Sequence, residues 1–394
     1  MSINTVNTIC NVPSKDCRLA NLVHFSRGTN ITSNEMLTGR YPVVSAGLKY
    51  SGFHNKFNVL GPSITVSASG ENAGIVLFHN YNFWAADCNF ADSSCNIIFA
   101  YYFLKYLQPA IFNMQNGAAQ PHVYAKDLNN LKVSIPSSDS LQTKIANVLS
   151  TYDKLIENNN KRIKLLEDMA ESLYKEWFVR FRFPGYENME FKNEIPKGWV
   201  YKNFSDIWKF SRGVSYSTEE IECEEGENLI NLKNIASYGG FRRDATKLYA
   251  GKYKDEQVVK FKDLIMGITD MTQDRRTVGA VALIPNIRGI ISADLIKLES
   301  EIDNVFSYCL FKYGFYSKLI SQFGNGANVI HLKPTSIKNQ KILIPDEIII
   351  NKFAALINPT IDEIEKLNSE NDLLIKQRDS LLPRLMSGKL EVKC

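Results

Sequence analysis

Two parts of the chain repeat one another in the same order, and this repetition limits the possible folds more than any other feature. The motif Phe-Ser-Arg-Gly stands at residues 25–28 and again at 210–213. Further segments have partners in the same order: Ser51–His54 with Gly239–Arg242, Asn72–Leu77 with Thr277–Ala282, Ala85–Asp87 with Ser292–Asp294, Asn116–Ala118 with Asn325–Ala327, and Ile135–Pro136 with Ile344–Pro345. The separation between partners grows steadily along the chain, as loop insertions in the second copy would produce. The period is too long for a solenoid. The sequence therefore predicts two copies of one domain, and the alternative is that the matches only reflect the common use of Gly, Ser and Asn in turns.

Each copy begins with a region of mixed secondary structure. Short β-rich runs, such as 63–66 and 74–78 in the first copy and 279–284 in the second, are separated by Gly, Asn and Ser turns. Such runs are typical of strands and hairpins. Helical stretches follow at 96–106 and 304–313. We therefore expect two α/β (mixed α+β) domains with irregular loops.

A long helix is predicted after each copy, because apolar residues recur in steps of three and four, the pattern of a coiled-coil seam. From Ser140 to about Phe178 the chain contains no Pro or Gly. The two predicted seams are Tyr152, Ile156, Asn159, Ile163, Leu166, Ala170, Leu173 and Trp177, and then Ile364, Leu367, Asn371, Leu374, Arg378, Leu381 and Leu385. Pro359 is expected in the first turn of the second helix or at a kink. Pro383 is expected to break that helix, and Gly388 to stop it.

The two helices are expected to pack on each other. A single helix with an apolar stripe is not stable alone, because the stripe must be buried. The duplication supplies a partner within the same chain, so we expect an antiparallel coiled coil. Asn159 either fixes the register of this pair as a buried polar group or is a solvated position.

Composition places the chain among reduced, water-soluble proteins. Its 394 residues suffice for about two domains. No apolar run is long enough to cross a bilayer, and the N-terminal segment lacks the pattern of a signal peptide. The seven Cys form no C-x-x-C pair, which favours free thiols and a cytoplasmic location. A net charge of +4 is only a weak indication of an anionic partner.

Motifs for catalysis are missing from the sequence. The chain contains no Pro-Pro, so the N/D-P-P-Y/F loop of adenine methyltransferases cannot be present, and Asn358-Pro359-Thr360 is only a fragment of it. There is no G-x-x-x-x-G-K-S/T phosphate loop. His79, Cys88 and Cys95 lack the spacing of a zinc site and are interpreted as small buried residues. The run 219–225 is interpreted as a solvated acidic loop. The sequence therefore predicts no catalytic residue, no metal and no cofactor for this chain.

Three segments of the chain match parts of one known family. Residues 173–185 read LYKEWFVRFRFPG, residues 195–199 read IPKGW and are followed by Phe-Ser-Arg-Gly, and residues 380–390 read SLLPRLMSGKL. In this order they resemble the central region, the entry into the second recognition domain and the end of the distal helix of the DNA-sequence-specificity subunits of type I restriction–modification enzymes. The resemblance covers the whole chain in the same order.

The resemblance implies a reader of double-stranded DNA. It divides the chain into a first target-recognition domain at 1–138, a central helix at 139–185, a second recognition domain at 186–346 and a distal helix at 347–394. Each domain would read one half of a bipartite, asymmetric site. The helices would fix the gap and dock two modification (methyltransferase) subunits, which restriction (nuclease/translocase) subunits join. S-adenosylmethionine, ATP and Mg would serve these partners. The family's Gln before each helix is present as Gln142, but 346–349 contain none, which puts a polar cap at the second helix in doubt.

Contacts with DNA are expected on loops that occupy equivalent places in the two copies. Arg can bridge guanine and Asn or Gln can bridge adenine in the major groove, while Lys and backbone N–H groups hold phosphates. The candidates are Arg27, His54, Asn55, Lys56, Asn72, Asn116, Gln120 and His122 in the first copy, and Arg212, Arg242, Arg243, Gln273, Arg275, Arg276, Asn325, Asn328 and His331 in the second.

Structural roles are the alternatives for several of these candidates. Arg242 and Arg243 could be solvated charges, and His122 and His331 could be turn residues. Arg27 and Arg212 could brace a turn. At the level of the chain, the alternatives are an orphan or silent specificity allele and a coiled-coil scaffold with protein-binding heads. Salt-dependent affinity for DNA would count against the scaffold.

Overall fold

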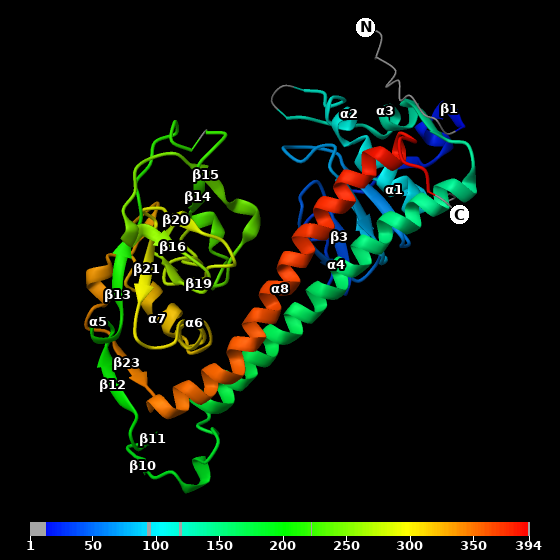
Figure 1. The fold of residues 1–394 in the computed structure, drawn as a ribbon. Helices are drawn as coiled ribbons and strands as arrows, with labels where there is room; N and C mark the ends of the chain where they lie inside the picture. Colours follow the sequence, from blue (N-terminus) through cyan, green and yellow to red (C-terminus); the bar gives the residue numbers. More distant parts are fainter. Residues whose placement is uncertain (1–12, 93–95, 118–119, 222, 393–394) are drawn as a thin grey trace. The chain divides into compact units, whose positions relative to one another are not determined.

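The computed structural model describes residues 13–392 except 93–95, 118–119 and 222. Residues 1–12 of the N-terminal segment lie outside the described residues, as do Cys95 and Ala118. The chain forms two compact units (Figure 1): Met1–Asn158 with Asn371–Cys394, and Asn159–Glu370. Each unit contains one copy of the repeat and a part of both long helices. The division of the chain into four consecutive parts stays a prediction.

The globular part of the first unit is built on an antiparallel four-stranded sheet. Its strand order is β2 (His24–Arg27), β8 (Cys88–Asp92), β5 (Ser63–Ser67) and β6 (Val76–His79). A three-stranded sheet has the order β4 (Gly52–His54), β3 (Tyr41–Val44) and β7 (Trp84–Ala85), and β1 (Ser14–Arg18) pairs with β9 (Lys132–Pro136). The helices of this part are α1 (Ile97–Tyr106), α2 (Gln108–Phe112) and α3 (Ala125–Asn130), and η1 (Leu19–Asn21) is a short 3-10 turn.

The second unit repeats this frame. Its two larger sheets have the orders β13 (Lys209–Arg212), β21 (Leu295–Glu299), β17 (Leu264–Gly267), β19 (Val281–Leu283), and β15 (Lys247–Tyr249), β14 (Glu227–Ile230), β20 (Gly289–Ile291), β16 (Val258–Val259). Strand pairs are formed by β12 (Val200–Asn203) with β23 (Lys341–Ile344), β18 (Thr269–Asp270) with β22 (Ile330–His331), and β10 (Phe191–Lys192) with β11 (Ile195–Pro196). The helices are α5 (Phe204–Ile207), α6 (Asn304–Tyr313) and α7 (Tyr316–Ser321), and the 3-10 turns are η3 (Tyr186–Asn188), η4 (Leu232–Asn234), η5 (Arg243–Ala245), η6 (Asp255–Gln257) and η7 (Pro334–Ile337).

Backbone pairing confirms the predicted duplication of a mixed α/β domain. The strand order β2-β8-β5-β6 of one unit becomes β13-β21-β17-β19 in the other. The parallel pair Val44 with Ala85 has its equivalent in Ile230 with Ile291. Helices α1 and α6 begin alike, because the side chains of Asn96 and Asp303 accept hydrogen bonds from the backbone N–H groups of Phe99 and Phe306.

The pairing also corrects two of the sequence matches. His54 lies opposite Tyr41 on β3, whereas on β14 the equivalent Glu227 lies opposite Tyr249. The counterpart of His54 is therefore Tyr249, and Arg242 with Arg243 lies in the connection 231–246, which is longer than the first copy's 45–51. The N–H of Ala86 donates to Val44 and that of Ser292 to Ile230. Ala86 thus corresponds to Ser292, one position from the sequence match.

Each globular part has its own apolar core, to which one helix of that part, α1 or α6, contributes buried side chains. In the first unit α1 packs against the sheet through Phe99 and Leu104, both fully buried beside Ile64 of β5. In the second unit α6 does the same through Phe306 and Phe311. Burying each of these side chains stabilises its unit by about 2 kcal/mol.

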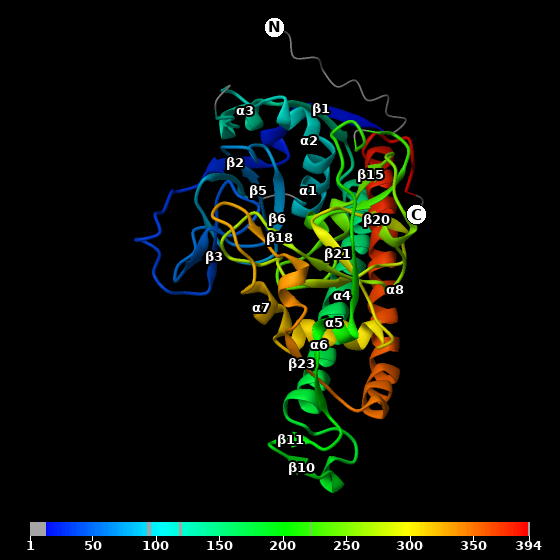
Figure 2. The ribbon, with the colours of Figure 1, turned by 90° about the vertical axis from the view of Figure 1, so that its left-hand side faces the viewer.

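Two long helices pass through both units (Figures 1 and 2). They are α4 (Asp139–Tyr174), which continues as a π-helical turn at Lys175–Val179, and α8 (Glu347–Met386). All predicted seam positions are buried or half-buried. In the second unit Arg162 pairs with Glu363 at 2.8 Å, and the rings of Trp177 and Phe353 lie 5.7 Å apart. From the first contact to the second, the residue number rises on α4 and falls on α8. The two helices therefore run antiparallel, as predicted.

Pro359 does not lie in the first turn of the second helix and Pro383 does not break it, so these two predictions are wrong, while a kink at Pro359 stays a prediction. Pro359 lies well inside α8, and α8 continues through Pro383 to Met386. Burial of Ile357 and Leu367 on either side of Pro359 holds the helix together although proline removes one backbone hydrogen bond. Gly388, with φ of 68°, follows the helix end in the left-handed conformation that favours glycine.

Polar groups at the helix starts and on the seam are satisfied or buried. The amide of Gln142 donates to the carbonyl of Pro136 at 2.9 Å. At α8, where the expected Gln is missing, the carboxylate of Asp346 accepts from the N–H of Ile348 at 2.9 Å and provides the polar cap. Asn159 is only 4% exposed, so it is a buried polar group and not a solvated one.

Candidate nucleic-acid interface

One loop has the same construction in both copies. In the first copy, Asn116 and His122 exchange two backbone hydrogen bonds of 2.9 and 2.8 Å, and Asn325 and His331 do the same at 2.9 Å in the second. The glycine after each Asn has positive φ, and at Gly326 a Cβ would stand 1.9 Å from the carbonyl oxygen of Val329. Only glycine fits there without strain. The exposed side chains presented on these loops are Asn116 and Gln120, and Asn325, Asn328 and His331.

A second pair of loops, which contain the candidates Asn72 and Gln273, lies directly beside the first. The N–H of Val123 donates to Ala68 at 3.0 Å, and that of Leu332 donates to Ile268 at 2.8 Å. Bridges join Ser69 to His122 and Thr269 to His331. The structure therefore brings together the loops 69–72 and 116–122 in the first unit, and 270–277 and 325–331 in the second. Asn72 itself is half-buried.

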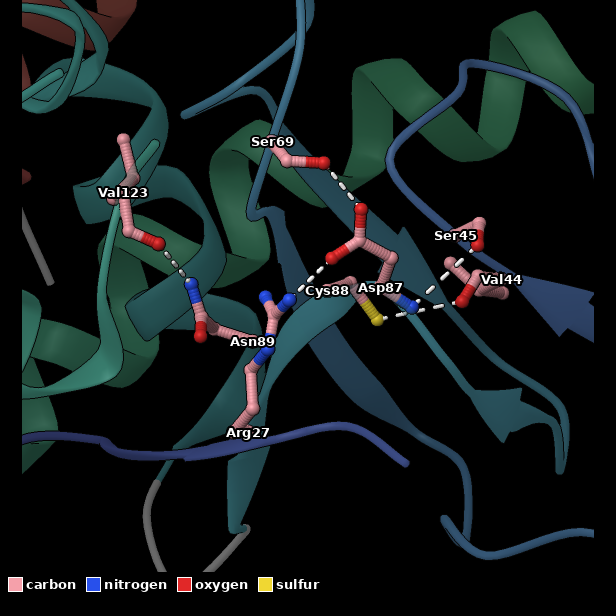
Figure 3. Close-up of polar contacts among 8 residues, drawn as sticks. All are labelled: Arg27, Val44, Ser45, Ser69, Asp87, Cys88, Asn89 and Val123. Atoms are coloured by element: carbon pink, nitrogen blue, oxygen red, sulfur yellow. Dashed lines mark hydrogen bonds and ion pairs between the residues drawn. The ribbon is translucent and has the colours of Figure 1, made fainter. Parts of the chain in front are cut away.

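In the first unit a polar network supports this surface (Figure 3). The carboxylate of Asp87 pairs with the guanidinium of Arg27 and accepts from the hydroxyl of Ser69. Two residues after Asp87, on β8, the side-chain amide of Asn89 donates to the carbonyl of Val123 at 2.9 Å. Arg27 is 46% exposed, but its charge is balanced by Asp87. This arrangement suits a brace between β2 and the loop that contains Ser69.

In the second unit the loop 270–277 is folded around a buried carboxylate. Asp270 accepts from the N–H and hydroxyl groups of Thr272 and Thr277, at 2.7 to 2.9 Å. Burial raises the pKa of Asp270, but these hydrogen bonds outweigh it, and the net pKa lies below its usual value. The loop is thus held in one shape by its own side chains.

The polar residues of this loop are tied to neighbouring segments. The amide of Gln273 donates to the carbonyl of Ala327 at 2.6 Å, which joins the two loops directly. Arg275 donates to the carbonyls of Ser321 and Gln322 at 3.2 and 3.3 Å. Arg276 is exposed and pairs with Asp274. Arg212 donates through Nε to the carbonyl of Ala293 at 3.1 Å, so its contact differs from that of Arg27.

Three candidates lie at the end of β4 or directly after it, and the structure places them differently. His54 is only 5% exposed: its Nδ1 accepts from the N–H of Leu37 at 3.0 Å, and its ring meets the edge of Trp84 at 5.1 Å. Its burial and these contacts give His54 a structural role between β4 and its neighbours, and a contact of this ring with DNA stays a prediction. Asn55 and Lys56, directly after it, are exposed.

The two arginines of the connection 231–246 differ from one another. Arg242 is exposed and pairs with Asp244 at 2.8 Å. Arg243 pairs with Glu365 of α8, and both side chains are mostly buried, at 24% and 15% exposed. Arg243 therefore fastens the globular part of its unit to the helix. Among the histidines, His122 stacks on Tyr124 with ring centroids 6.0 Å apart, and His331 lies 3.4 Å from the hydroxyl of Thr269.

Sequence reasoning missed the acidic residues that organise the interface. Asp87 was part of a repeat match, but its pairing with Arg27 depends on strand register. Asp270 ends β18 and precedes two threonines, which is a pattern typical of side-chain turns and could have been noticed. Glu365 gives no local signal, because its ion-pair partner Arg243 and the N–H of Asn286 lie far away in the sequence.

His79 and the thiol of Cys88, both buried in the first unit, have structural contacts. His79 lies between the hydroxyls of Thr65 and Tyr81, at 2.8 and 3.1 Å, and burial lowers its pKa to about 4. The thiol of Cys88 donates to Val44, and burial raises its pKa to about 12. Within the described ranges no group of three or more His, Cys, Asp or Glu side chains could hold a metal. No helix of the described part is both long and apolar enough to cross a membrane.

Comparisons with known proteins agree with this architecture. A family model described as the type I restriction modification DNA specificity domain matches residues 11–168. The type I restriction enzyme MjaIX specificity subunit of Methanocaldococcus jannaschii is 30% identical over 302 residues, which are 73% of this chain and 67% of that protein. The MjaVIII specificity subunit of the same organism is 23% identical over 95% of this chain and 92% of its own length.

A solved structure has the same fold. The crystal structure of a type I restriction–modification system S subunit from M. genitalium matches 97% of this chain and 98% of its own, with a TM-score of 0.62 and 20% identity. Because the matches with MjaVIII and with this structure span both copies of the repeat, they cover both units. The chain belongs to the family of type I restriction enzyme specificity subunits, the non-catalytic subunits that recognise DNA.

Proposed function

We propose that each unit reads one half of a bipartite DNA site through its pair of adjoining loops. The observation that carries this proposal is the common construction of the loops closed by Asn116 and His122 and by Asn325 and His331. Loops held by strand ends can present hydrogen-bonding side chains to base edges with little loss of entropy on binding. Equivalent loops at equivalent places are what two readers of one duplex need.

The two half-sites should differ in sequence, because the exposed side chains differ while the frame is the same. The first unit presents the neutral groups Asn116 and Gln120, which suit adenine. The second presents Asn328 together with Arg276, which suits guanine or a phosphate. An asymmetric site follows.

The long helices are proposed to set the gap between the half-sites and to bind two modification subunits. Both helices carry exposed apolar side chains: Leu155, Leu165 and Met169 on α4, and Leu373 and Ile375 on α8. Such residues favour a protein partner. Restriction subunits would join this core in the cytoplasm, and S-adenosylmethionine, ATP and Mg would be used by the partners.

The proposal is tested by mapping DNA methylation. The chain is co-expressed with the modification subunit encoded beside it, in a host without other methylation, and modified adenines are located by long-read sequencing. One split motif with two specified halves and an unspecified gap is expected. A stable complex that produces no methylation would contradict an active allele.

The role of the helices is tested separately by shortening one of them. Removing four residues from α4 shortens it by about one turn, 5.4 Å, which is between one and two base pairs. The same mapping should then show a changed gap and unchanged half-sites. Altered half-site sequences would contradict a helix that sets only the spacing.

A further inference from the structure

The second unit has a structural feature that its repeat partner lacks. The connection between β14 and β15, residues 231–246, is longer than the equivalent 45–51 and contains two 3-10 turns. Its middle forms a small hairpin, in which Ile235 bridges Phe241 and the N–H of Ala236 donates to Gly240 at 2.9 Å. Ile235 is 3% exposed in a core that Phe241 also contacts. The hairpin is therefore anchored by apolar side chains.

The tip of this hairpin has an unusual backbone conformation. Tyr238, Gly239 and Gly240 all have positive φ, at 66°, 112° and 112°. A bulky residue in this region is strained and persists only where its surroundings hold it. Here the N–H of Tyr238 donates to the carbonyl of Arg276 at 2.8 Å, and the N–H of Gly240 donates to Val281 at 2.8 Å. The tip is thus fixed to the neighbouring loop 270–277.

The side chain of Tyr238 faces solvent beside the candidate interface. It is 66% exposed, among the most exposed large side chains of the described residues. Its backbone bond to Arg276 joins it to the loop that Gln273 in turn joins to Ala327. Three connections of the second unit, 231–246, 270–277 and 325–331, therefore form one hydrogen-bonded surface with an aromatic ring at its border.

We propose that Tyr238 is a DNA-contacting residue of the second unit, which packs its ring against a base or deoxyribose next to that unit's half-site. The inference rests on the proposed function, because it assumes that this surface faces DNA. A flat aromatic ring beside amide and guanidinium groups fits the apolar surface of a deoxyribose or of a base edge at the wall of a groove, which a duplex of any sequence offers. An anchored ring also loses little conformational entropy on binding. The first unit lacks such a hairpin, since its connection 45–51 is too short, and the exposed Tyr50 of that connection is instead hydrogen-bonded through its hydroxyl to Tyr81.

The proposal assigns Tyr238 to one half-site only. Tyr238→Ala should weaken binding of the complete site at least about tenfold, the effect expected for one lost aromatic contact. Tyr238→Phe should bind within about twofold of the parent chain, because a ring contact needs no hydroxyl. Tyr201→Ala is the matched control, since Tyr201 is a 57% exposed tyrosine of the same unit on β12.

The experiment uses the full chain in complex with its modification subunit, and measures binding to duplex DNA of the mapped motif. In parallel, a photo-crosslinking phenylalanine analogue replaces Tyr238 or Tyr201. Loss of affinity in Tyr238→Ala alone, and a DNA crosslink from position 238 but not 201, are expected. Parent-like affinity of Tyr238→Ala, or no crosslink from position 238 in a complex that binds DNA, would overturn the inference and leave the proposed function intact. If the parent complex binds no DNA, both the inference about Tyr238 and the proposed function are contradicted.

Discussion

The two units share a backbone frame but differ in what they bury at equivalent positions. In the first unit Thr65 and His79 form a buried polar pair, with Nε2 of His79 at 2.8 Å from the threonine hydroxyl. Strand pairing places Ile265 and Ile284 of the second unit at these positions, and both are fully buried. The register of the strands is therefore kept while the chemistry of the core changes. The frame depends on pattern and pairing, not on particular side chains.

The same contrast holds on the surface. Arg27 and Arg212 occupy equivalent positions in the repeated Phe-Ser-Arg-Gly, yet one pairs with the carboxylate of Asp87 and the other donates to the carbonyl of Ala293. A shared motif thus keeps a turn in place but does not fix the electrostatics around it. Variants at matched positions in the two units can test how independent the units are.

The largest expected effect comes from emptying the equivalent cores. Phe99→Ala and Phe306→Ala remove fully buried rings that follow the two helix caps, and each should destabilise its own unit by about 3–5 kcal/mol. Hydrogen exchange followed by mass spectrometry of the whole chain measures this unit by unit. Faster exchange should stay within the altered unit. Equal acceleration in both units after either change would show that they unfold as one.

Acid should destabilise the first unit selectively. His79 is buried and neutral, with its pKa lowered to about 4, whereas the unfolded chain binds this proton near pH 6.5. As pH falls from 6.5 toward 4, the unfolded state binds the proton before the folded state does. The contribution of neutral His79 to the free energy of unfolding is therefore fully present above pH 6.5 and is lost across this window, by about 3 kcal/mol. Thr65→Ile with His79→Ile, the residues of the second unit, should remove this loss. Hydrogen exchange at pH 7 and pH 5 measures it, and an unchanged pH dependence in the double variant would exclude His79 as the cause.

Arg242 and Arg243 should have unequal effects on the second half-site. Arg243→Ala leaves the mostly buried Glu365 without its charged partner, although the N–H of Asn286 and the hydroxyl of Ser369 still donate to it, and should cost about 1–3 kcal/mol in the anchoring of the loop 231–246. Arg242→Ala breaks only an exposed pair, worth less than about 1 kcal/mol. Methylation mapping should show weaker specification of one half of the motif in Arg243→Ala and in the double variant. Equal loss at both halves would contradict two independent readers.

Periodic patterns made the helices and the duplication predictable. Steps of three and four residues identified seam positions such as Leu166 and Leu367, because each apolar side chain must face the partner helix. Register inside the sheets was less predictable. Gly240-Phe241 resembles Gly52-Phe53 in sequence, yet an insertion displaces it from β4's equivalent, so His54 was matched to Arg242 instead of Tyr249.

The candidate site was predicted where a turn has a local signature and missed where it depends on distant contacts. Asn-Gly at 116–117 and 325–326 is a local signature of a turn. Both segments do form loops, which are closed by backbone hydrogen bonds to His122 and His331. Burial of His54 against Trp84, or pairing of Arg243 with Glu365, arises only after strands and helices pack. No pattern within a few residues of either side chain could reveal these contacts.

The smallest expected effect separates a brace from a DNA contact at Arg27. The Arg27–Asp87 pair is half-exposed, so its loss should change stability by less than about 1 kcal/mol. Arg27→Ala leaves a negative Asp87 beside the loop that contains Ser69, and this charge should repel phosphate and weaken DNA binding. Adding Asp87→Asn removes that charge, and if Arg27 is a brace, affinity should return to within about twofold of the parent. In this double variant the slope of log affinity against log salt concentration should equal that of the parent, whereas the loss of a phosphate contact would reduce the magnitude of the slope by about 0.9. Arg212→Ala is the matched comparison, because Arg212 pairs with a carbonyl and its removal uncovers no opposing charge.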